Sequence, residues 1–164
     1  MLNNALRYKQ WADRRTLDAV AQIDAQRFPS SMAFARQQLN HIVRVEELFR
    51  ARLLGQAEPH ASTNTEAVPT LEELDRRLSA SNAWLLPYAA ALSPEQLAAS
   101  IHFQFVDGQA GRLNREEALF HFVNHGTYHR GAIGHALDLA QAPRPADTYT
   151  VFIHAAEPGR REPA

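Results

Sequence analysis

The chain has 164 residues, enough for one domain with a hydrophobic core and too few for two domains of ordinary size. Its 17 basic and 18 acidic side chains give a formal net charge of −1, so it lacks the strongly basic balance of proteins that bind nucleic acid. Cysteine is absent, which excludes disulfides, thiolate metal ligands and a cysteine nucleophile, and leaves histidine and carboxylate side chains as metal ligands.

No targeting or membrane segment is expected. Residues 1–15 carry charges throughout and lack the apolar core of a signal peptide. No apolar run approaches the roughly 18 residues of a membrane span. We therefore expect a soluble, cytoplasmic protein that binds neither a membrane nor nucleic acid.

The first predicted helix covers residues 2–23, where apolar residues recur at helical spacing. Lys9 and Asp13 are one turn apart and point into the apolar arc of this helix. Two interpretations are open. Either the two side chains form a polar pair at the rim of a helix bundle, or Asp13 lies near a metal ion, as an outer-shell partner of its ligands and a candidate catalytic base.

A second helix is predicted over residues 32–54. Its inward arc consists of Phe34, Gln38, His41, Ile42, Val45, Leu48, Phe49 and Arg52. Apolar residues flank His41 in this arc, so its ring should point into the core, either as a hydrogen-bonded core residue or as a metal ligand. Gln38, one turn earlier, faces the same region. Glu46 and Glu47 fall outside the arc, and we expect both to be solvated.

A polar crossover is predicted at residues 55–69, and His60 within it is expected to be exposed. Thr70 and Glu73 then form a capping-box pattern that begins a third helix. Leucines at heptad-like spacing continue this helix, and Pro87 should kink or shorten it.

A β-hairpin is predicted before the last long helix. Residues 93–96 open a short helical turn, residues 101–105 alternate between apolar and polar, and the Asp-Gly pair at 107–108 is a turn signal before the return strand. A second capping-box pattern at residues 114–117 then begins a long helix over residues 115–141.

Three histidines of this last helix, His121, His125 and His129, recur every four residues and therefore lie along one line of the helix. An adjacent pair can bind one metal ion, whereas all three cannot, because the outer two are about 12 Å apart at 1.5 Å per residue. His125 belongs to either possible pair. The remaining ligand must come from elsewhere in the chain, which makes His41 the candidate. Gly126, on an adjoining face, indicates a close helix contact.

Three segments of the chain resemble the DinB/YfiT-like family, which is distinct from the DNA polymerase that shares the DinB name. These segments are Tyr8–Asp13, Leu39–Ile42 and His121–Gly131, of which the last is the most specific. The resemblance covers nearly the whole chain and implies an all-α fold, a four-helix bundle with up-down-down-up connectivity, here with a small β-hairpin before the last long helix. It also implies a homodimer. We expect a single domain over residues 1–155 and a flexible tail over residues 156–164.

Members of that family hold a divalent ion through three histidines, one from the second helix and two from the fourth. Carried over by motif, the resemblance implies that His41, His125 and His129 are metal ligands and that His121 is not. Asp13 stands where asparagine is common in the family. The implied ion is zinc or nickel, with iron, copper or manganese as alternatives.

Relatives of known activity include thiol-dependent transferases and a mycothiol-dependent maleylpyruvate isomerase, and the resemblance implies a damage-inducible protein. Three neutral imidazoles leave coordination positions open, as in catalytic zinc sites. We therefore predict a metal-dependent hydrolase or thiol-dependent transferase that acts on a small molecule, with a low-molecular-weight thiol as a candidate partner. The alternative is a metal-binding, stress-related scaffold or interaction protein without turnover.

Overall fold

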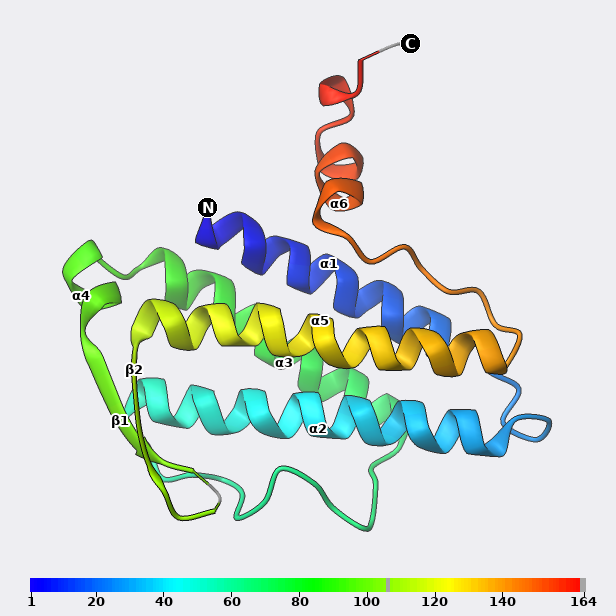
Figure 1. Ribbon diagram of the computed structural model, residues 1–164, viewed down its shortest axis with the longest axis horizontal. Helices are drawn as coiled ribbons and strands as arrows, with labels where there is room; N and C mark the ends of the chain where they lie inside the picture. Colours follow the sequence, from blue (N-terminus) through cyan, green and yellow to red (C-terminus); the bar gives the residue numbers. More distant parts are fainter. Residues whose placement is uncertain (106, 163–164) are drawn as a thin grey trace.

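The computed structural model describes residues 1–105 and 107–162, which are mostly helical and include one small antiparallel sheet. Four long helices lie side by side (Figure 1). They are α1 (Leu2–Val20), α2 (Pro29–Leu54), α3 (Leu71–Ala90) and α5 (Arg115–Leu139). The shorter elements are α4 (Pro94–Ala98), β1 (Ser100–Gln104), β2 (Ala110–Asn114), α6 (Tyr149–Ala156) and the 3₁₀ turn η1 (Pro158–Arg160).

Helix ends follow the signals in the sequence. The Asn114 side chain accepts a hydrogen bond from the Glu117 backbone N–H, and the Glu117 carboxylate accepts one from the Asn114 N–H, so the predicted capping box at the start of α5 is confirmed. Thr70 caps α3 through its hydroxyl, which accepts a hydrogen bond from the Glu73 backbone N–H, but the predicted capping box is only half formed, because the Glu73 carboxylate accepts from Arg76 instead. Helix α2 ends at Gly55, whose φ of 64° is readily adopted only by glycine.

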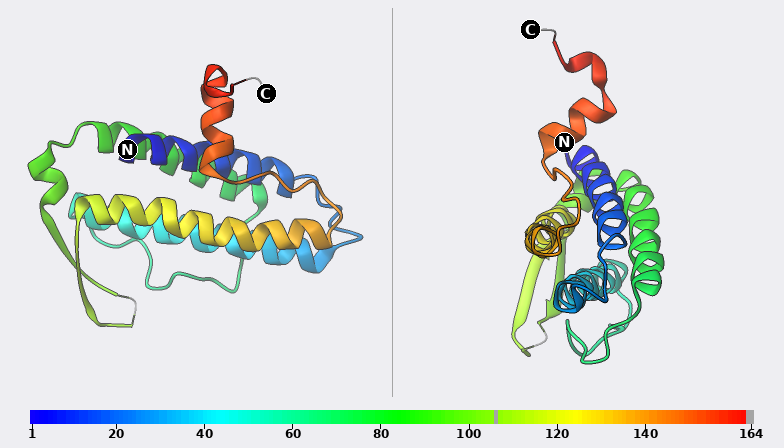
Figure 2. Two further views of the ribbon diagram at one scale, coloured as in Figure 1. Left: turned by 45° about the horizontal axis from the view of Figure 1, so that its top comes forward. Right: turned by 90° about the vertical axis from the view of Figure 1, so that its right-hand side faces the viewer.

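Each long helix contacts two others: α1 and α2 both pack against α3 and against α5. The end-on view in Figure 2 shows this arrangement. The interior contains two apolar clusters. One includes Leu6, Val45, Phe49, Leu85, Leu119 and Phe122, and the other includes Leu17, Leu39, Ile42, Leu78, Ile133 and Leu137. Between them, buried polar and charged side chains form a layer in the middle of the bundle, which comprises Lys9, Asp13, Glu46, Ser81, Asn82 and Arg130.

The predicted hairpin is confirmed by the pairing of β1 with β2, from Ser100 opposite Asn114 to Gln104 opposite Ala110. The hairpin packs against α2 and α5. A Cβ atom at Gly111 would lie 2.7 Å from ring atoms of Phe103 and of Phe105, so this position needs glycine.

Several boundaries differ from the sequence predictions. Helix α1 ends at Val20 rather than at residue 23, because the chain turns there toward α2. Helix α3 passes through Pro87 and ends at Ala90. Phe34, predicted to face inward, has 45 % of its surface exposed, whereas the next residue, Ala35, is completely buried, so the inward face of α2 at its first turns passes through Ala35 rather than Phe34.

Beyond α5, the chain returns along the bundle and α6 projects away from it (Figures 1 and 2). Phe152 of α6 packs against Tyr8 and Trp11 of α1. The turn η1 lies within the predicted flexible tail, and the last two residues of that tail, Pro163 and Ala164, lie outside the described residues. Among the described helices, none combines the length and apolarity that a bilayer crossing requires.

Candidate metal centre

Three imidazole rings from two helices converge between α2 and α5. One ring nitrogen from each of His41, His125 and His129 lies within 4.8 Å of the others. His41 Nε2 is 3.1 Å from His125 Nε2, and the ring centroids of His41 and His129 are 4.5 Å apart. Two nitrogens bound to one zinc ion at 2.0–2.1 Å in tetrahedral geometry are about 3.3 Å apart. The spacing of these rings therefore fits a single divalent ion.

Hydrogen bonds at the far side of two rings fix which nitrogen faces the common point. His41 Nδ1 is 3.2 Å from the carbonyl oxygen of Thr63, and His129 Nδ1 is 2.6 Å from Gln38 Oε1. A carbonyl oxygen only accepts hydrogen bonds, so each Nδ1 carries the hydrogen and each neutral ring keeps its lone pair on Nε2. Metal-binding histidines are commonly oriented in this way. Gln38 thus faces the site, as predicted.

Burial keeps the imidazoles uncharged. The pKa of His125 is lowered to about 3, first by burial and then by the neighbouring histidines and Lys9. The pKa of His129 is lowered to about 4, by burial and by His41. Both rings are therefore neutral at pH 7, the form that donates a lone pair to a metal ion.

His121 lies next to the cluster but outside it. Its ring centroid is 5.0 Å from that of His125 and 4.6 Å from that of Phe49, so the ring lies against an aromatic wall. Burial, followed by the charge of Arg52, lowers its pKa. Of the two histidine pairs left open by spacing alone, the structure brings the pair that includes His129 to His41.

The structure excludes one of the two interpretations of Asp13, a polar pair at the rim of the bundle, whereas its place near a metal ion stays a prediction. Lys9 and Asp13 are completely or almost completely buried, so they are not at the rim of the bundle. The Asp13 carboxylate accepts hydrogen bonds from Lys9 Nζ, Asn82 Nδ2 and Arg130 Nη1, at 2.7, 3.0 and 2.8 Å. Burial alone would raise the pKa of Asp13, but the charges of Lys9 and Arg130 outweigh it and lower this pKa. These contacts give Asp13 a role in the buried polar layer.

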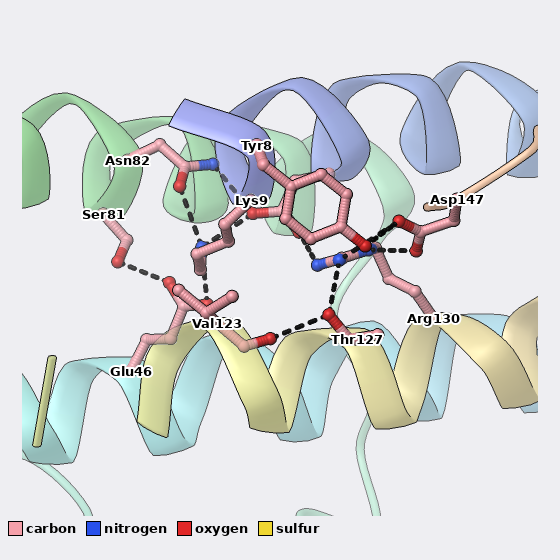
Figure 3. Close-up of polar contacts among 10 residues, drawn as sticks. Tyr8, Lys9, Glu46, Ser81, Asn82, Val123, Thr127, Arg130 and Asp147 are labelled. Atoms are coloured by element: carbon pink, nitrogen blue, oxygen red, sulfur yellow. Dashed lines mark hydrogen bonds and ion pairs between the residues drawn. The ribbon is translucent and has the colours of Figure 1, made fainter. Parts of the chain in front are cut away.

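Glu46 belongs to the same layer, and the prediction that it is solvated is wrong. It has 2 % of its surface exposed, lies 2.8 Å from Lys9 Nζ and accepts a hydrogen bond from Ser81 (Figure 3). The physical reason is that α2 packs against α3 as well as α5, so it buries a second face. Burial raises the pKa of Glu46.

Glu47 was also predicted to be solvated, and it is instead half-buried. Its carboxylate accepts two hydrogen bonds from Arg77 of α3 and one from His60 of the crossover. His60, expected to be exposed, is therefore partly covered as well. Both departures arise because the crossover folds back over α2 and brings His60 to the α2–α3 side.

Arg130 completes the buried layer, and the sequence analysis missed it. Its guanidinium pairs with Asp13 and with Asp147, which also accepts a hydrogen bond from the Tyr8 hydroxyl (Figure 3). A Cβ atom at Gly126 would lie 2.8 Å from Arg130 Nη1. Gly126 was the available signal, because it makes room for this guanidinium rather than for a neighbouring helix.

Comparison with known sequences agrees with this geometry. No curated protein and no solved structure matches the chain significantly. The sequence model of the DinB family matches residues 1–162, which is nearly the whole chain. The protein therefore belongs to the DinB family.

Proposed function

We propose that His41, His125 and His129 bind one divalent metal ion and that the protein is a metal-dependent enzyme, of the hydrolase or the thiol-dependent transferase type. The convergence of three imidazoles, two of them oriented by Thr63 and Gln38, is the observation that carries this proposal. Imidazole ligands suit several divalent ions, of which we propose zinc or nickel, with iron, copper or manganese as alternatives. The substrate is a small molecule, for which a low-molecular-weight thiol is the leading co-substrate.

The residues of the site have separable roles in this proposal. The three histidines supply neutral nitrogen ligands and leave the remaining coordination positions to water or substrate. Gln38 and the Thr63 carbonyl hold the rings of His129 and His41 in orientation. A divalent ion bound there lowers the pKa of a coordinated water or thiol, so that a nucleophile is available near neutral pH.

The arrangement of the helices supports the finer fold assignment that accompanies this function. In Figure 1, α1 and α5 run in one direction and α2 and α3 in the other. We therefore assign the chain to the up-down-down-up four-helix bundles of the DinB/YfiT-like type. A cytoplasmic homodimer is part of the same proposal.

Metal analysis of purified protein provides the first test. We expect about one divalent ion per chain in the parent protein and loss of that ion in His125→Ala. His135→Ala is the matched control, because His135 lies on the same helix and is exposed. An unchanged metal content in His125→Ala would exclude the assigned site.

Catalysis is tested separately with a panel of thiols and electrophiles. Saturable turnover that requires the ion and disappears in His125→Ala is expected. A fully loaded protein that turns over no member of the panel would instead favour a metal-binding, stress-related scaffold without turnover.

A further inference from the structure

A cavity lies on the α2–α3 side of the molecule, and none of its lining residues belongs to the histidine cluster. Its volume is about 530 Å³. Residues of α2, of α3 and of the crossover between them line it, and the charged or titratable ones are Glu47, Arg50, His60, Glu73, Arg76 and Arg77. Three arginines thus face two glutamates in a chain that carries a small net negative charge.

Both glutamates hold arginines in a fixed orientation. Glu47 accepts hydrogen bonds from Nε and Nη2 of Arg77, and Glu73 accepts them from the same two nitrogens of Arg76. In each pair, this leaves Nη1 of the guanidinium without a hydrogen-bond acceptor among the residues that the structure describes. Two neighbouring guanidinium groups therefore line one cavity in fixed orientations, and the Nη1 N–H donors of both are available to a ligand.

One further group, Arg50, adds to these donors. Arg50 of α2 lies over the Trp84 ring, with its Cζ 5.1 Å from the ring centroid, and forms no ion pair within residues 1–105 and 107–162. His60 donates through Nε2 to Glu47, so the Nδ1 of its neutral ring is an acceptor and adds no donor for an anion.

Positive charges are crowded around this cavity. The pKa of Arg44, on α2, is lowered first by burial and then by the charge of Arg77. Arg44 itself donates to the carbonyl oxygen of Ser62. An anion in the cavity would relieve this repulsion and accept the remaining N–H groups.

We infer that the α2–α3 cavity is a binding site for a small oxyanion, a phosphate or carboxylate compound, separate from the metal centre. Arg50, Arg76 and Arg77 supply the charge-assisted hydrogen bonds, and Glu47 fixes Arg77 and His60 in position. Phosphate and carboxylate groups both present two oxygens at a spacing that lets one guanidinium group donate two parallel hydrogen bonds.

Titration of ¹⁵N-labelled full-length protein with inorganic phosphate, succinate or sodium chloride at matched ionic strength tests this inference. We expect saturable shifts of the backbone amides that line the cavity, such as those of Ala57 and Ala80, with phosphate, with succinate or with both. The anion whose chemical-shift changes reach saturation is the preferred oxyanion. Chloride should give only small, non-saturating shifts.

Arg50→Gln/Arg76→Gln should weaken that binding by at least about tenfold, because two charged donors are lost. Both side chains are exposed, so the fold should be unaffected, which circular dichroism checks. Arg160→Gln is the matched control, since Arg160 is exposed and paired with a glutamate three residues earlier, as Arg76 is. Shifts equal to those with chloride, or equal affinity in the double variant and the control, would overturn the inference.

Discussion

Replacement of Lys9 with methionine measures what the buried polar layer contributes to stability. Lys9 is completely buried, and its Nζ lies 2.7 Å from Asp13 Oδ2, 2.8 Å from Glu46 Oε1 and 2.8 Å from Asn82 Oδ1. Methionine fills similar space without a charge, so two buried carboxylates lose the cation they share. Removal of one partner from a buried ion pair lowers the free energy of unfolding by about 3–5 kcal/mol.

The two carboxylates are not affected equally. Asp13 keeps Arg130, whose Nη1 is 2.8 Å away, whereas among the residues that the structure describes Glu46 keeps only the hydroxyl of Ser81. Burial already raises the pKa of Glu46, so in the variant this side chain takes up a proton instead of remaining charged. We therefore expect a loss near the lower end, about 3 kcal/mol at pH 7. A carboxyl group whose pKa is raised by folding lowers the free energy of unfolding only at pH values above its pKa in the unfolded chain. The loss should therefore shrink as the pH falls toward 4.5, the ordinary pKa of glutamate.

Urea denaturation followed by circular dichroism measures this loss, and two further variants make the reasoning specific. In Glu46→Gln, Lys9 and Arg130 still face two carboxylates, Asp13 of the layer and Asp147 beside it, so the stability should stay within about 1 kcal/mol of the parent. Lys9→Met/Glu46→Gln should recover part of the loss. Arg14→Met is the matched control, because Arg14 is also on α1 and pairs with two carboxylates, Asp18 and Asp75, but is about half exposed. It should cost at most about 1 kcal/mol. Equal losses in Lys9→Met and Arg14→Met would refute the argument from burial.

Three other outcomes follow from the structure. Gln38→Ala should weaken metal binding by about 10–100-fold without loss of helicity, because His129 loses the hydrogen-bond acceptor at its Nδ1. Competition with a chromophoric chelator measures the affinity, and an unchanged affinity would contradict the orienting role of Gln38. Gly126→Ala should destabilise the protein by displacing Arg130, whereas Gly131→Ala, with nothing within 4 Å of its added Cβ, should stabilise it by up to about 1 kcal/mol. Thermal unfolding compares the two variants, and stabilisation by both would disprove that the Arg130 guanidinium needs the space beside residue 126. For metal-free protein, the free energy of unfolding should fall as the pH drops from about 6.5 toward 3, because in this range His125 and His129 bind protons in the unfolded chain but not in the folded one. The slope should be at most about 1.4 kcal/mol per pH unit for each group. Urea titrations between pH 7 and pH 4 should give a shallower dependence in His125→Ala, and an identical dependence would argue against burial as the cause of the lowered pKa.

The part of the site that the sequence reveals is the part that is local. His125 and His129 lie one helical turn apart, so spacing alone places them on one face of α5. His41 is 84 residues from His125, and only the apolar surroundings of His41 and the family motif connected it to that pair. The Thr63 carbonyl was not predictable, because a backbone group in an irregular crossover has no signature in the sequence.

Charged residues in the core were predicted less well, for a reason that Glu46 illustrates. A single apolar arc was assigned to α2, which is appropriate for a helix that packs on one side. Helix α2 contacts both α3 and α5, so a larger part of its circumference is buried and the arc underestimates it. The partners of Glu46, Lys9 and Ser81, come from α1 and α3, and no local pattern joins these three residues.

The same limitation explains Arg130, whose partners Asp13 and Asp147 are 117 and 17 residues away. Helix α5 presents His125 and His129 to α2, and on its adjoining face it presents Gly126 and Arg130 to α1. A rotation of α5 about its axis would move both sets together. The buried ion pairs of Arg130 therefore restrain the direction in which the two histidines point, and a side chain at residue 126 would disturb that restraint.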